Sequence, residues 1–308
     1  MGMARAVRHC VLLIAAAAAL VAPPGSRAAD HRQRPLIVFM SDFGTLDEAV
    51  AICKGVMLGV APDAEIIDLT HEVTPYSIAE GARLLAGTAP YYPTGTVFIA
   101  VIDPGVGTSR KPIVVKTKRG QYFVGPDNGL VTPLIDRDGL AGAREIRNPA
   151  WTLSGERSST FHGRDVFSPA AAHLARGEDW RGVGPALGTP ARLEIPRATV
   201  DERGIHGSVV GLDGPYGNLV TNISGDEFGA LGYAAGDPVH IKVGIEELSV
   251  PLAGTFGEVP VGAALLFVDS RGLVSLAINQ GNFATAHRVG PPAELVIFRK
   301  GPAPATQR

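Results

Sequence analysis

Cysteine and charge are both scarce in this sequence. The 308 residues include two cysteines, and Asp, Glu, Lys and Arg together make up 19%. Only Cys53 follows the N-terminal segment described below, so the rest of the chain has no second cysteine for an intrachain disulfide. A lone cysteine in a helical pattern is usually a small core hydrophobe. Hydrophobic residues reach 45%, which is enough for the core of one large domain or two of ordinary size.

Several catalytic signatures are also missing. The chain has no P-loop, no GxSxG nucleophile elbow, and no HExxH or CxxC pair for zinc. The most glycine-rich candidate, GVGTSR at 105–110, lacks the third glycine of the dinucleotide fingerprint. It also follows the third predicted strand, whereas the fingerprint follows the first. The sequence therefore gives no support to the enzyme classes that these motifs define.

The first 29 residues have the pattern of a secretory signal. Two arginines precede the apolar run 11–22, and small residues near Ala28 and Ala29 mark a cleavage site. The run is short for a membrane span of about 20 apolar residues, although an uncleaved anchor is the alternative. We therefore predict an exported protein, periplasmic or secreted, with no membrane contact after cleavage.

The charge that remains after cleavage is slightly acidic. Removing residues 1–29 takes away three arginines and no acid, which leaves 25 basic and 30 acidic residues, a net of −5. Nucleic acids and anionic membranes favour a basic patch on the protein that binds them. The charge balance therefore argues against both as partners.

In the first half of the chain, apolar runs of strand length alternate with helical patterns. Each helical pattern opens with a capping box, in which Thr or Ser precedes Glu by three positions. This order predicts a doubly wound, mostly parallel sheet flanked by helices. We assign this α/β domain to residues 34–190. The expected strands are 36–40, 64–69 and 96–102, and the expected helices begin at Thr45/Glu48 and Ser77/Glu80 and run through about residues 60 and 85.

The second half of the chain has a different pattern. Glycines and prolines cluster at 182–197, where we place a domain boundary. Short strands with Gly, Asp and Asn turns follow, and they predict an all-β, barrel-like domain at 198–300. The expected strands there are 205–212, 238–243, 263–268, 273–278 and 293–298. Before the boundary we expect strands at 112–118 and 122–124, a turn at 125–129, a loop at 146–160 and a helix at 165–176.

Three acids, Asp42, Asp68 and Asp103, stand at the ends of the first three predicted strands. In open α/β sheets the carboxyl ends of the strands form the edge where ligands bind. A strand-end Asp also often caps a turn, but three in register favour a binding edge. Arg110 lies seven positions after Asp103, so the two are a candidate reaction centre or, alternatively, a surface ion pair worth under about 1 kcal/mol.

A binuclear metal phosphoesterase is another alternative, because several acids and histidines could gather around two ions. Against it, the histidines are scattered singly, without an HxH or HxxxH pair. The residues concerned are Asp42, Asp68, His71, Asp103, Asp127 and His162.

Seven motifs follow one another along the chain: SDFGT at 41–45, DLTHEV at 68–73, GTVFIAVIDPGVGT at 95–108, FVGPDNGL at 123–130, TFHGRDVFSPAAA at 160–172, DGPYGNLVTNI at 213–223 and SRG at 270–272. Together they resemble the S-adenosylmethionine hydrolases, also called S-adenosylmethionine hydroxide adenosyltransferases, which are related to the fluorinase and chlorinase. The resemblance runs from about residue 36 to 298. It implies an N-terminal α/β domain, a C-terminal β-barrel domain and a homotrimer. The active sites would lie between the N-terminal domain of one subunit and the C-terminal domain of the next.

The resemblance also implies a reaction, in which water or hydroxide displaces methionine from C5′ of the ribose and gives adenosine and L-methionine. A sulfonium is already an activated leaving group, so no metal or other cofactor is expected. Alignment of the reactants supplies about 7–11 kcal/mol in favourable cases. The residues that match the family's hydrolytic triad are Asp103, Arg110 and His162. Asp103 is expected to hold and polarise the water, Arg110 to stabilise developing hydroxide, and His162 to complete the hydrogen bonds.

The substrate-binding residues are likewise implied by the resemblance. Asp42 matches a carboxylate that grips both ribose hydroxyls, and Tyr76 is expected beside the ribose. Two further groups match contacts to methionine and adenine. For methionine they are Asp47, Asp213, Ser270 and Arg271; for adenine they are Tyr216, Asn218 and the backbone of Ile278, with Phe256 as a further neighbour.

Two positions differ from the halogenating relatives. Asp103 stands where the fluorinase has Tyr, and Gly163 where it has a halide-contacting Ser. A carboxylate beside the nucleophile repels a halide, so we expect transfer to water. Export fits the family poorly, because S-adenosylmethionine is a cytoplasmic metabolite; the enzyme either meets external substrate or acts on another adenosyl compound. The alternative from another class is an exported nucleoside-binding protein with little catalysis.

Overall fold

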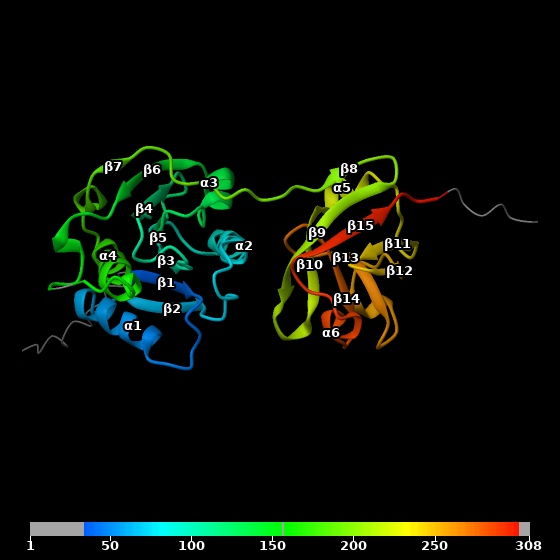
Figure 1. The fold of residues 1–308 in the computed structure, drawn as a ribbon, viewed down its shortest axis with the longest axis horizontal. Helices are drawn as coiled ribbons and strands as arrows, with labels where there is room; N and C mark the ends of the chain where they lie inside the picture. The colour runs from blue at the N-terminus through cyan, green and yellow to red at the C-terminus, as the bar shows by residue number, and fades with distance from the viewer. Residues whose placement is uncertain (1–33, 156, 302–308) are drawn as a thin grey trace, which may run out of the picture. The chain divides into compact units, whose positions relative to one another are not determined.

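The computed structural model describes residues 34–155 and 157–301. The predicted signal at 1–29 lies outside these residues. Within the described ranges, no helix has the length and hydropathy needed to span a membrane. The chain builds two sheets, one from each half of the sequence, which are described separately (Figure 1).

The first sheet is mixed, with strand order β2-β1-β3-β5-β4-β6-β7. The pairings β2-β1, β1-β3 and β3-β5 are parallel, as the β-α-β-α-β order predicted for the first three strands. β4, β6 and β7 are antiparallel, which the mostly parallel assignment did not specify. The elements are β1 (Leu36–Ser41), α1 (Ala49–Val60), β2 (Glu65–Thr70), α2 (Ile78–Thr88), η1 (Ala89–Tyr91), β3 (Val97–Val101), β4 (Pro112–Thr117), β5 (Tyr122–Pro126), α3 (Thr132–Asp138), β6 (Leu140–Glu145), η2 (Pro149–Trp151), the π-helix η3 (Gly163–Phe167), α4 (Ser168–Ala175), η4 (Trp180–Val183) and β7 (Ala186–Leu187).

Helices cover both faces of this sheet (Figure 1). On one face, Met57 of α1 and Ala171 of α4 pack with Phe39 of β1 in a single buried cluster. On the other face, Leu85 of α2 and Leu134 of α3 pack in a second cluster with the strand residues that alternate with the first set. Successive strand side chains point to opposite faces, so a continuous apolar strand needs such a double cover. The doubly wound architecture is therefore confirmed.

The capping box predicted at Thr45 and Glu48 is wrong. α1 begins only at Ala49, and Glu48 makes no side-chain cap. Thr45 Oγ1 donates instead to Glu72 Oε1 (3.1 Å), a residue beyond β2. A tertiary hydrogen bond therefore takes the hydroxyl that the sequence pattern assigns to a helix cap.

The second predicted capping box forms in part. Ser77 Oγ accepts a hydrogen bond from the Glu80 backbone N–H at 3.4 Å, and α2 begins at the next residue. The Glu80 side chain turns to the Thr74 backbone N–H (3.0 Å). The helix predicted at 165–176 also exists, but its first turn is the π-helix Gly163–Phe167.

The second sheet is antiparallel and nearly closed, with order β12-β11-β15-β9-β10-β14-β13 and β8 paired with β9. A backbone hydrogen bond from Ala253 N–H to Leu266 O (2.9 Å) connects the chain after β12 to β13. The barrel-like prediction is confirmed, although β10 and β12 were not expected. The elements are β8 (Thr199–Val200), β9 (Gly204–Asp213), η5 (Gly214–Tyr216), β10 (Asn218–Ser224), α5 (Gly225–Gly229), β11 (Pro238–Val243), β12 (Glu246–Pro251), η6 (Phe256–Glu258), β13 (Ala264–Val268), β14 (Leu273–Ile278), α6 (Phe283–His287) and β15 (Ala293–Phe298).

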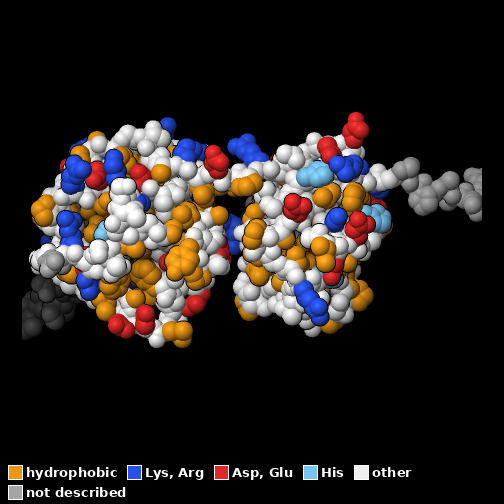
Figure 2. Space-filling model, viewed as in Figure 1, with side chains coloured by type: hydrophobic (Ala, Val, Ile, Leu, Met, Phe, Trp, Pro, Cys, Tyr) orange, Lys and Arg blue, Asp and Glu red, His pale blue; other side chains and the backbone are white. Residues whose placement is uncertain are grey.

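The surface carries charges of both signs. On the face in Figure 2, basic and acidic side chains are intermingled with apolar ones. This distribution agrees with the near balance of 28 basic and 30 acidic residues in the whole sequence.

Candidate active site

A pocket of about 330 Å³ lies at the carboxyl edge of the first sheet. β1 and β3 are parallel neighbours, and each ends beside the pocket with an acid: Asp42 after β1 and Asp103 after β3. Parallel pairing thus brings together two acids that are far apart in sequence. The pocket is lined by Asp42, Phe43, Pro75, Tyr76, Val101, Asp103, Val106, Thr160, Phe161, His162 and Gly163.

Asp103, Arg110 and His162 form one hydrogen-bonded cluster at this pocket. Arg110 binds Asp103 through both arms of its guanidinium, with Nε donating to Oδ1 at 3.0 Å and Nη2 donating to Oδ2. The same Nη2 lies 3.0 Å from His162 Nδ1. The Asp103 and Arg110 side chains are 6% and 7% exposed, so the pair is buried. The surface ion pair considered from the sequence is excluded.

Burial perturbs both titratable partners of Arg110. It raises the pKa of Asp103 above its ordinary value, although the charge and hydrogen bonds of Arg110 oppose that rise. Burial also lowers the pKa of His162, and the nearby charge of Arg110 adds to the effect. A neutral His162 can accept from Arg110 at Nδ1 and carry its proton on Nε2. The cluster therefore combines an anion, a cation and a neutral imidazole.

The loop between Asp103 and Arg110 is fixed by its own hydrogen bonds. Thr108 Oγ1 donates to Gly105 O (2.7 Å) and accepts from the Arg110 N–H (3.3 Å). Gly107 has φ +79°, and a Cβ there would lie 2.6 Å from the Ser159 carbonyl oxygen. Only glycine fits this turn, which brings the loop against the segment that precedes His162.

Asn128 supports Asp103 from the neighbouring turn, and the sequence argument missed it. Its Nδ2 donates to the carbonyl oxygen of Ile102 (2.9 Å), the residue before Asp103. Its Oδ1 accepts from Leu130 N–H at 3.2 Å. Asn128 belongs to the GPDNG sequence at 125–129, where an Asn is usually explained by turn formation alone.

His162 is presented by the wide π turn that precedes α4. Asp165 within this turn is 1% exposed and accepts from the Ser158 backbone N–H at 2.7 Å. It also accepts from Arg164 Nε at 2.5 Å. Burial acts to raise the pKa of Asp165, but the hydrogen bonds from Arg164 and Ser158 lower it overall. Single π turns often occur at functional sites, and here one orients a site residue.

Asp42 and Tyr76 also line this pocket and contact each other. The Tyr76 backbone N–H donates to Asp42 Oδ2 at 2.9 Å. Tyr76 has φ +68°, a left-handed conformation that is unusual for an aromatic residue, and it is 73% exposed. This strained turn directs the Tyr76 N–H toward the carboxylate.

A second pocket, of about 660 Å³, lies on the antiparallel sheet. It brings together the residues that the resemblance assigned to adenine, and it adds three polar side chains with amide groups. Its lining is Pro215, Tyr216, Asn218, Phe256, Ile278, Asn279, Gln280, Gly281 and Asn282.

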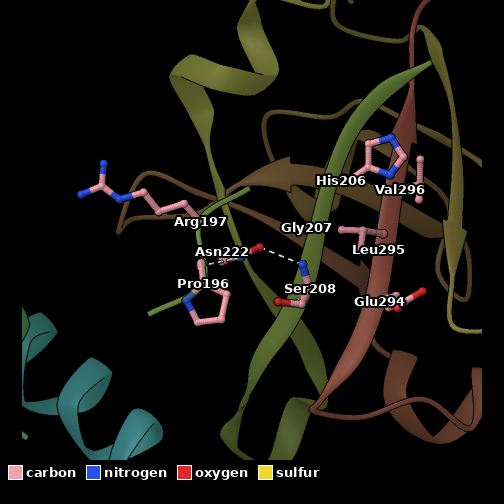
Figure 3. A pocket seen from close by; sticks show the side chains of 9 residues that line it. All are labelled: Pro196, Arg197, His206, Gly207, Ser208, Asn222, Glu294, Leu295 and Val296. Atoms are coloured by element: carbon pink, nitrogen blue, oxygen red, sulfur yellow. Dashed lines mark hydrogen bonds between the residues drawn. The ribbon is translucent and has the colours of Figure 1, made fainter. Parts of the chain in front are cut away.

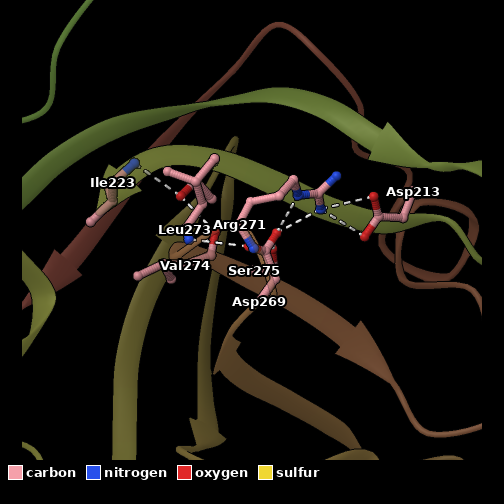
Figure 4. A network of polar contacts seen from close by, with 8 residues as sticks. Asp213, Ile223, Asp269, Arg271, Leu273, Val274 and Ser275 are labelled. Atoms are coloured by element: carbon pink, nitrogen blue, oxygen red, sulfur yellow. Dashed lines mark hydrogen bonds and ion pairs between the residues drawn. The ribbon is translucent and has the colours of Figure 1, made fainter. Parts of the chain in front are cut away.

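Arg271 and Asp213, two of the residues assigned to methionine, form an ion pair on the same sheet (Figure 4). Arg271 Nη2 lies 2.9 Å from Asp213 Oδ1 and 2.6 Å from Asp269 Oδ2. Asp269 was missed by the sequence argument, yet it also accepts from Ser275 Oγ (3.1 Å). Burial acts to raise its pKa, but hydrogen bonds from Arg271 and backbone N–H groups lower it overall. Asp269 is therefore the anionic anchor of Arg271.

Two assigned residues are not brought to these clusters. Asp47 is exposed, and its Oδ1 accepts from the Ala49 N–H (3.0 Å) at the start of α1. It does not line the pocket at the sheet edge. Ser270 is exposed in the turn between Asp269 and Arg271. The methionine-binding roles of Asp47 and Ser270 remain predictions.

The acids and histidines considered for a binuclear metal site do not converge on one point, although Asp42, Asp103 and His162 line the same pocket. His71 is bound to Ser41 and Asp68, and Asp127 Oδ1 accepts from the Ala191 N–H (2.7 Å). Across residues 34–155 and 157–301, no three His, Cys, Asp or Glu side chains are grouped as ligands for a metal ion.

A further hollow, of about 280 Å³, lies beside β9 and β15 (Figure 3). Asn222 crosses it, accepting from the Ser208 N–H at 2.7 Å and donating to Pro196 O at 2.8 Å. None of the residues assigned to the site from the sequence lines it.

Comparison with known proteins identifies the family. Residues 37–184 match the SAM hydroxide adenosyltransferase N-terminal domain, and residues 207–296 match the C-terminal domain. The "(R)-S-adenosyl-L-methionine hydrolase" of Salinispora arenicola is 39% identical, covering 85% of this chain and 97% of the relative. The "Fluorinase" of Actinopolyspora mzabensis is 32% identical over 83% of this chain and 94% of the relative.

A solved structure agrees with these matches. An uncharacterized conserved protein from Thermotoga maritima superposes with a TM-score of 0.80 at 39% identity, covering 85% of this chain and 99% of that one. The chain belongs to the SAM hydroxide adenosyltransferase family. The resemblance drawn from the seven sequence motifs is therefore confirmed.

Proposed function

We propose that this protein hydrolyses S-adenosyl-L-methionine to adenosine and L-methionine. The observation that carries the proposal is the buried cluster of Asp103, Arg110 and His162 at a pocket that also contains Asp42. This cluster occurs in a chain that is 39% identical to a relative named "(R)-S-adenosyl-L-methionine hydrolase".

In the proposed reaction, the oxygen of water or hydroxide attacks C5′ in line with the sulfonium. The new C5′–O bond forms as the C5′–S bond breaks, and the electron pair of that bond neutralises the sulfur of methionine. The proton of the attacking water passes to Asp103 or to solvent. The substrate supplies an activated leaving group, so the protein has to supply alignment and a competent nucleophile, without a metal or other cofactor.

Arg110 and Asp103 prepare the nucleophile in different ways. Water has a pKa of about 15.7, and a carboxylate of ordinary pKa near 3.9 is a weak base for it. Burial raises the pKa of Asp103 and so strengthens it as a base. The positive charge of Arg110 stabilises hydroxide electrostatically, and in a buried site this effect is large. We assign hydroxide stabilisation to Arg110, and orientation and proton acceptance to Asp103.

His162 supplies the third contact. Its lowered pKa keeps it neutral near neutral pH, and Nδ1 faces Arg110 Nη2 at 3.0 Å. Nε2–H is then the donor available to the attacking oxygen. An added positive charge at His162 would compete with Arg110 for Asp103, so the neutral form is the active one.

Substrate recognition is proposed for both pockets. Asp42 presents two acceptor oxygens that suit the cis-diol of ribose, with Tyr76 beside it. The pocket around Tyr216, Asn218 and Ile278 is assigned to adenine. The methionine moiety is assigned to the residues predicted for it, Asp47, Asp213, Ser270 and Arg271.

Two observations favour water over a halide as the nucleophile. Asp103 lines the pocket, and its carboxylate repels anions there. A Cβ at Gly163 would lie 2.9 Å from the Phe43 ring, so a serine there requires Phe43 to move. The local packing thus supports the hydrolase assignment over a halogenase.

The test is chromatographic. Purified protein is incubated with S-adenosyl-L-methionine, with and without EDTA, and adenosine is measured beside the matched variant Asp103→Asn. We expect adenosine in both wild-type samples and strongly reduced formation by the variant. Adenosine in neither sample refutes the proposal, and adenosine only without EDTA indicates a required metal. Tight adenosine binding with equal turnover by wild type and variant would instead support a nucleoside-binding protein.

The proposal includes assembly and location. We propose a homotrimer, which light scattering on a sizing column measures directly. We also propose export directed by residues 1–29, which fractionation of expressing cells tests. A monomer at micromolar concentration, or protein confined to the cytoplasm, would contradict these two parts separately.

A further inference from the structure

A hydrogen-bond chain of Ser41, His71, Asp68 and Lys54 lies beside the pocket at the ends of β1 and β2, and the proposed reaction does not use it. Ser41 and His71 are buried, whereas the Asp68 and Lys54 side chains are 41% and 32% exposed. Ser41 Oγ lies 2.7 Å from His71 Nδ1. His71 Nε2 lies 3.1 Å from Asp68 Oδ1, and Lys54 Nζ donates to Asp68 Oδ2 at 2.5 Å. A carboxylate only accepts hydrogen bonds, so His71 Nε2 is the donor to Asp68. In the neutral imidazole, Nδ1 then accepts from the Ser41 hydroxyl.

These residue types also occur in serine hydrolases, but the geometry excludes that role. Ser41 is 0% exposed, His71 is 4% exposed, and neither lines a pocket at the sheet edge. The imidazole is also reversed, because its Nδ1 faces the serine and its Nε2 faces the acid, the opposite of the hydrolase triad. The hydrogen-bond chain therefore supports neighbouring groups, and Ser41 is not a nucleophile.

The hydrogen-bond chain fixes residues on both sides of Asp42: Ser41 before it, and the backbone of Phe43 and Gly44 after it. The Phe43 N–H donates to Ser41 Oγ at 3.3 Å, and the Gly44 N–H donates to the carbonyl oxygen of His71 at 2.7 Å. Asp42 lies between these anchored positions, and its carboxylate lines the pocket. The His71 ring is itself held edge-on against Phe39, with ring centroids 4.6 Å apart.

We propose that His71, oriented by Asp68 and acting through Ser41, is the positioning residue that holds Asp42 for the ribose diol. The inference rests on the proposed function, which assigns the diol to Asp42. A carboxylate held before the substrate arrives loses less conformational freedom on binding. The hydrogen-bond chain therefore determines how strongly the site distinguishes a ribose from a sugar that lacks the 2′ and 3′ hydroxyls.

The test measures that discrimination directly. Calorimetry on the intact protein gives the ratio of the dissociation constants of 2′,3′-dideoxyadenosine and adenosine. A site built to bind hydroxyls rejects an analogue without them, so we expect wild type to prefer adenosine at least about tenfold. Ser41→Ala should lower this preference by about fivefold or more.

Two substitutions of His71 separate its contact with Ser41 from its contact with Asp68. His71→Asn places Oδ1 near the position of Nδ1 and keeps an acceptor for Ser41. His71→Gln places an amide near Nε2 and keeps the donor to Asp68. We expect His71→Asn to retain most of the preference and His71→Gln to lose it as Ser41→Ala does. If Ser41→Ala does not fold, the comparison of His71→Asn with His71→Gln still shows whether the contact with Ser41 sets the preference for adenosine.

The matched control is Thr132→Val. Thr132 is buried, and its Oγ1 accepts from the Leu193 backbone N–H (2.9 Å), the same kind of contact as Ser41 with Phe43. Its loss should lower the thermal midpoint without changing the preference. A preference unchanged in Ser41→Ala and His71→Gln overturns the inference while leaving the proposed function intact. A wild type that binds both nucleosides equally removes the ribose role of Asp42, and with it the basis of the inference.

Discussion

Replacing Arg110 with Met leaves the Asp103 carboxylate buried without its cation. The two side chains are 6% and 7% exposed and share a bidentate contact. Removing one member of a buried pair typically costs about 3–5 kcal/mol, whereas an exposed pair is worth about 0–1 kcal/mol. We therefore expect Arg110→Met to lower the free energy of unfolding by about 3–5 kcal/mol at pH 8.

The loss of unfolding free energy in Arg110→Met should increase as pH rises. Burial already raises the pKa of Asp103 with Arg110 present, and removing the cation raises it further. A raised acid pKa in the folded state favours the folded protein below the unfolded value of about 3.9, and this advantage is lost as pH rises through the folded pKa. The deficit of Arg110→Met should therefore be small near pH 4 and reach its full size above the folded pKa of Asp103.

Urea unfolding followed by tryptophan fluorescence measures this deficit. Both tryptophans of the sequence report on the core of the first sheet, because Trp151 is buried in it and the partly buried Trp180 packs against it. With a slope of about 1–3 kcal/mol per molar urea, the midpoint at pH 8 should fall by about 1 M or more. The double variant Asp103→Asn/Arg110→Met should recover much of the loss, because no charge remains buried.

The control is Arg192→Met, which removes an equally close but exposed contact with Asp136. Its cost should stay below about 1 kcal/mol at every pH. A deficit of Arg110→Met that matches this control, or that is the same at pH 4 and pH 8, would refute the argument from burial.

Three further predictions concern single groups. The acid limb of kcat/KM should have its midpoint below pH 6.5, because burial lowers the pKa of His162; a limb at or above 6.5 contradicts the neutral role. Asn128→Ala should reduce kcat and lower stability by about 1–3 kcal/mol, because it leaves the Ile102 carbonyl unpaired next to Asp103; unchanged kinetics and unfolding contradict the support described for it. Burial raises the pKa of the Cys53 thiol to about 11, so a thiol-disulfide reagent at pH 8 should modify Cys53 only after unfolding; rapid labelling of the native protein contradicts this.

Apolar runs in the sequence were sufficient to locate the central strands, because burial on both faces demands them. They did not determine strand direction. Only residues 118–121 join β4 and β5, and so short a connection excludes the crossover that parallel strands need. Connection length was therefore the available signal for the antiparallel half of the sheet.

The candidate site was predictable to different degrees. Asp42 and Asp103 were found from strand ends, because parallel pairing aligns those ends at one edge. His162 lies on a distant loop, and no local periodicity connects it with Arg110; only the family resemblance did. Asp269 and Asn128 act through other site residues, and a residue that anchors a partner has no motif of its own.

The π turn at Gly163–Phe167 has a consequence for how this protein can vary. Each residue of an α-helix advances the chain by about 100° around its axis, since a turn takes 3.6 residues. Deleting one residue between His162 and α4 would convert the wide turn to an ordinary one and rotate the imidazole by about that angle, away from Arg110. Related sequences can therefore exchange side chains in this segment. An insertion or deletion of a single residue in it, by contrast, separates His162 from Asp103 and Arg110.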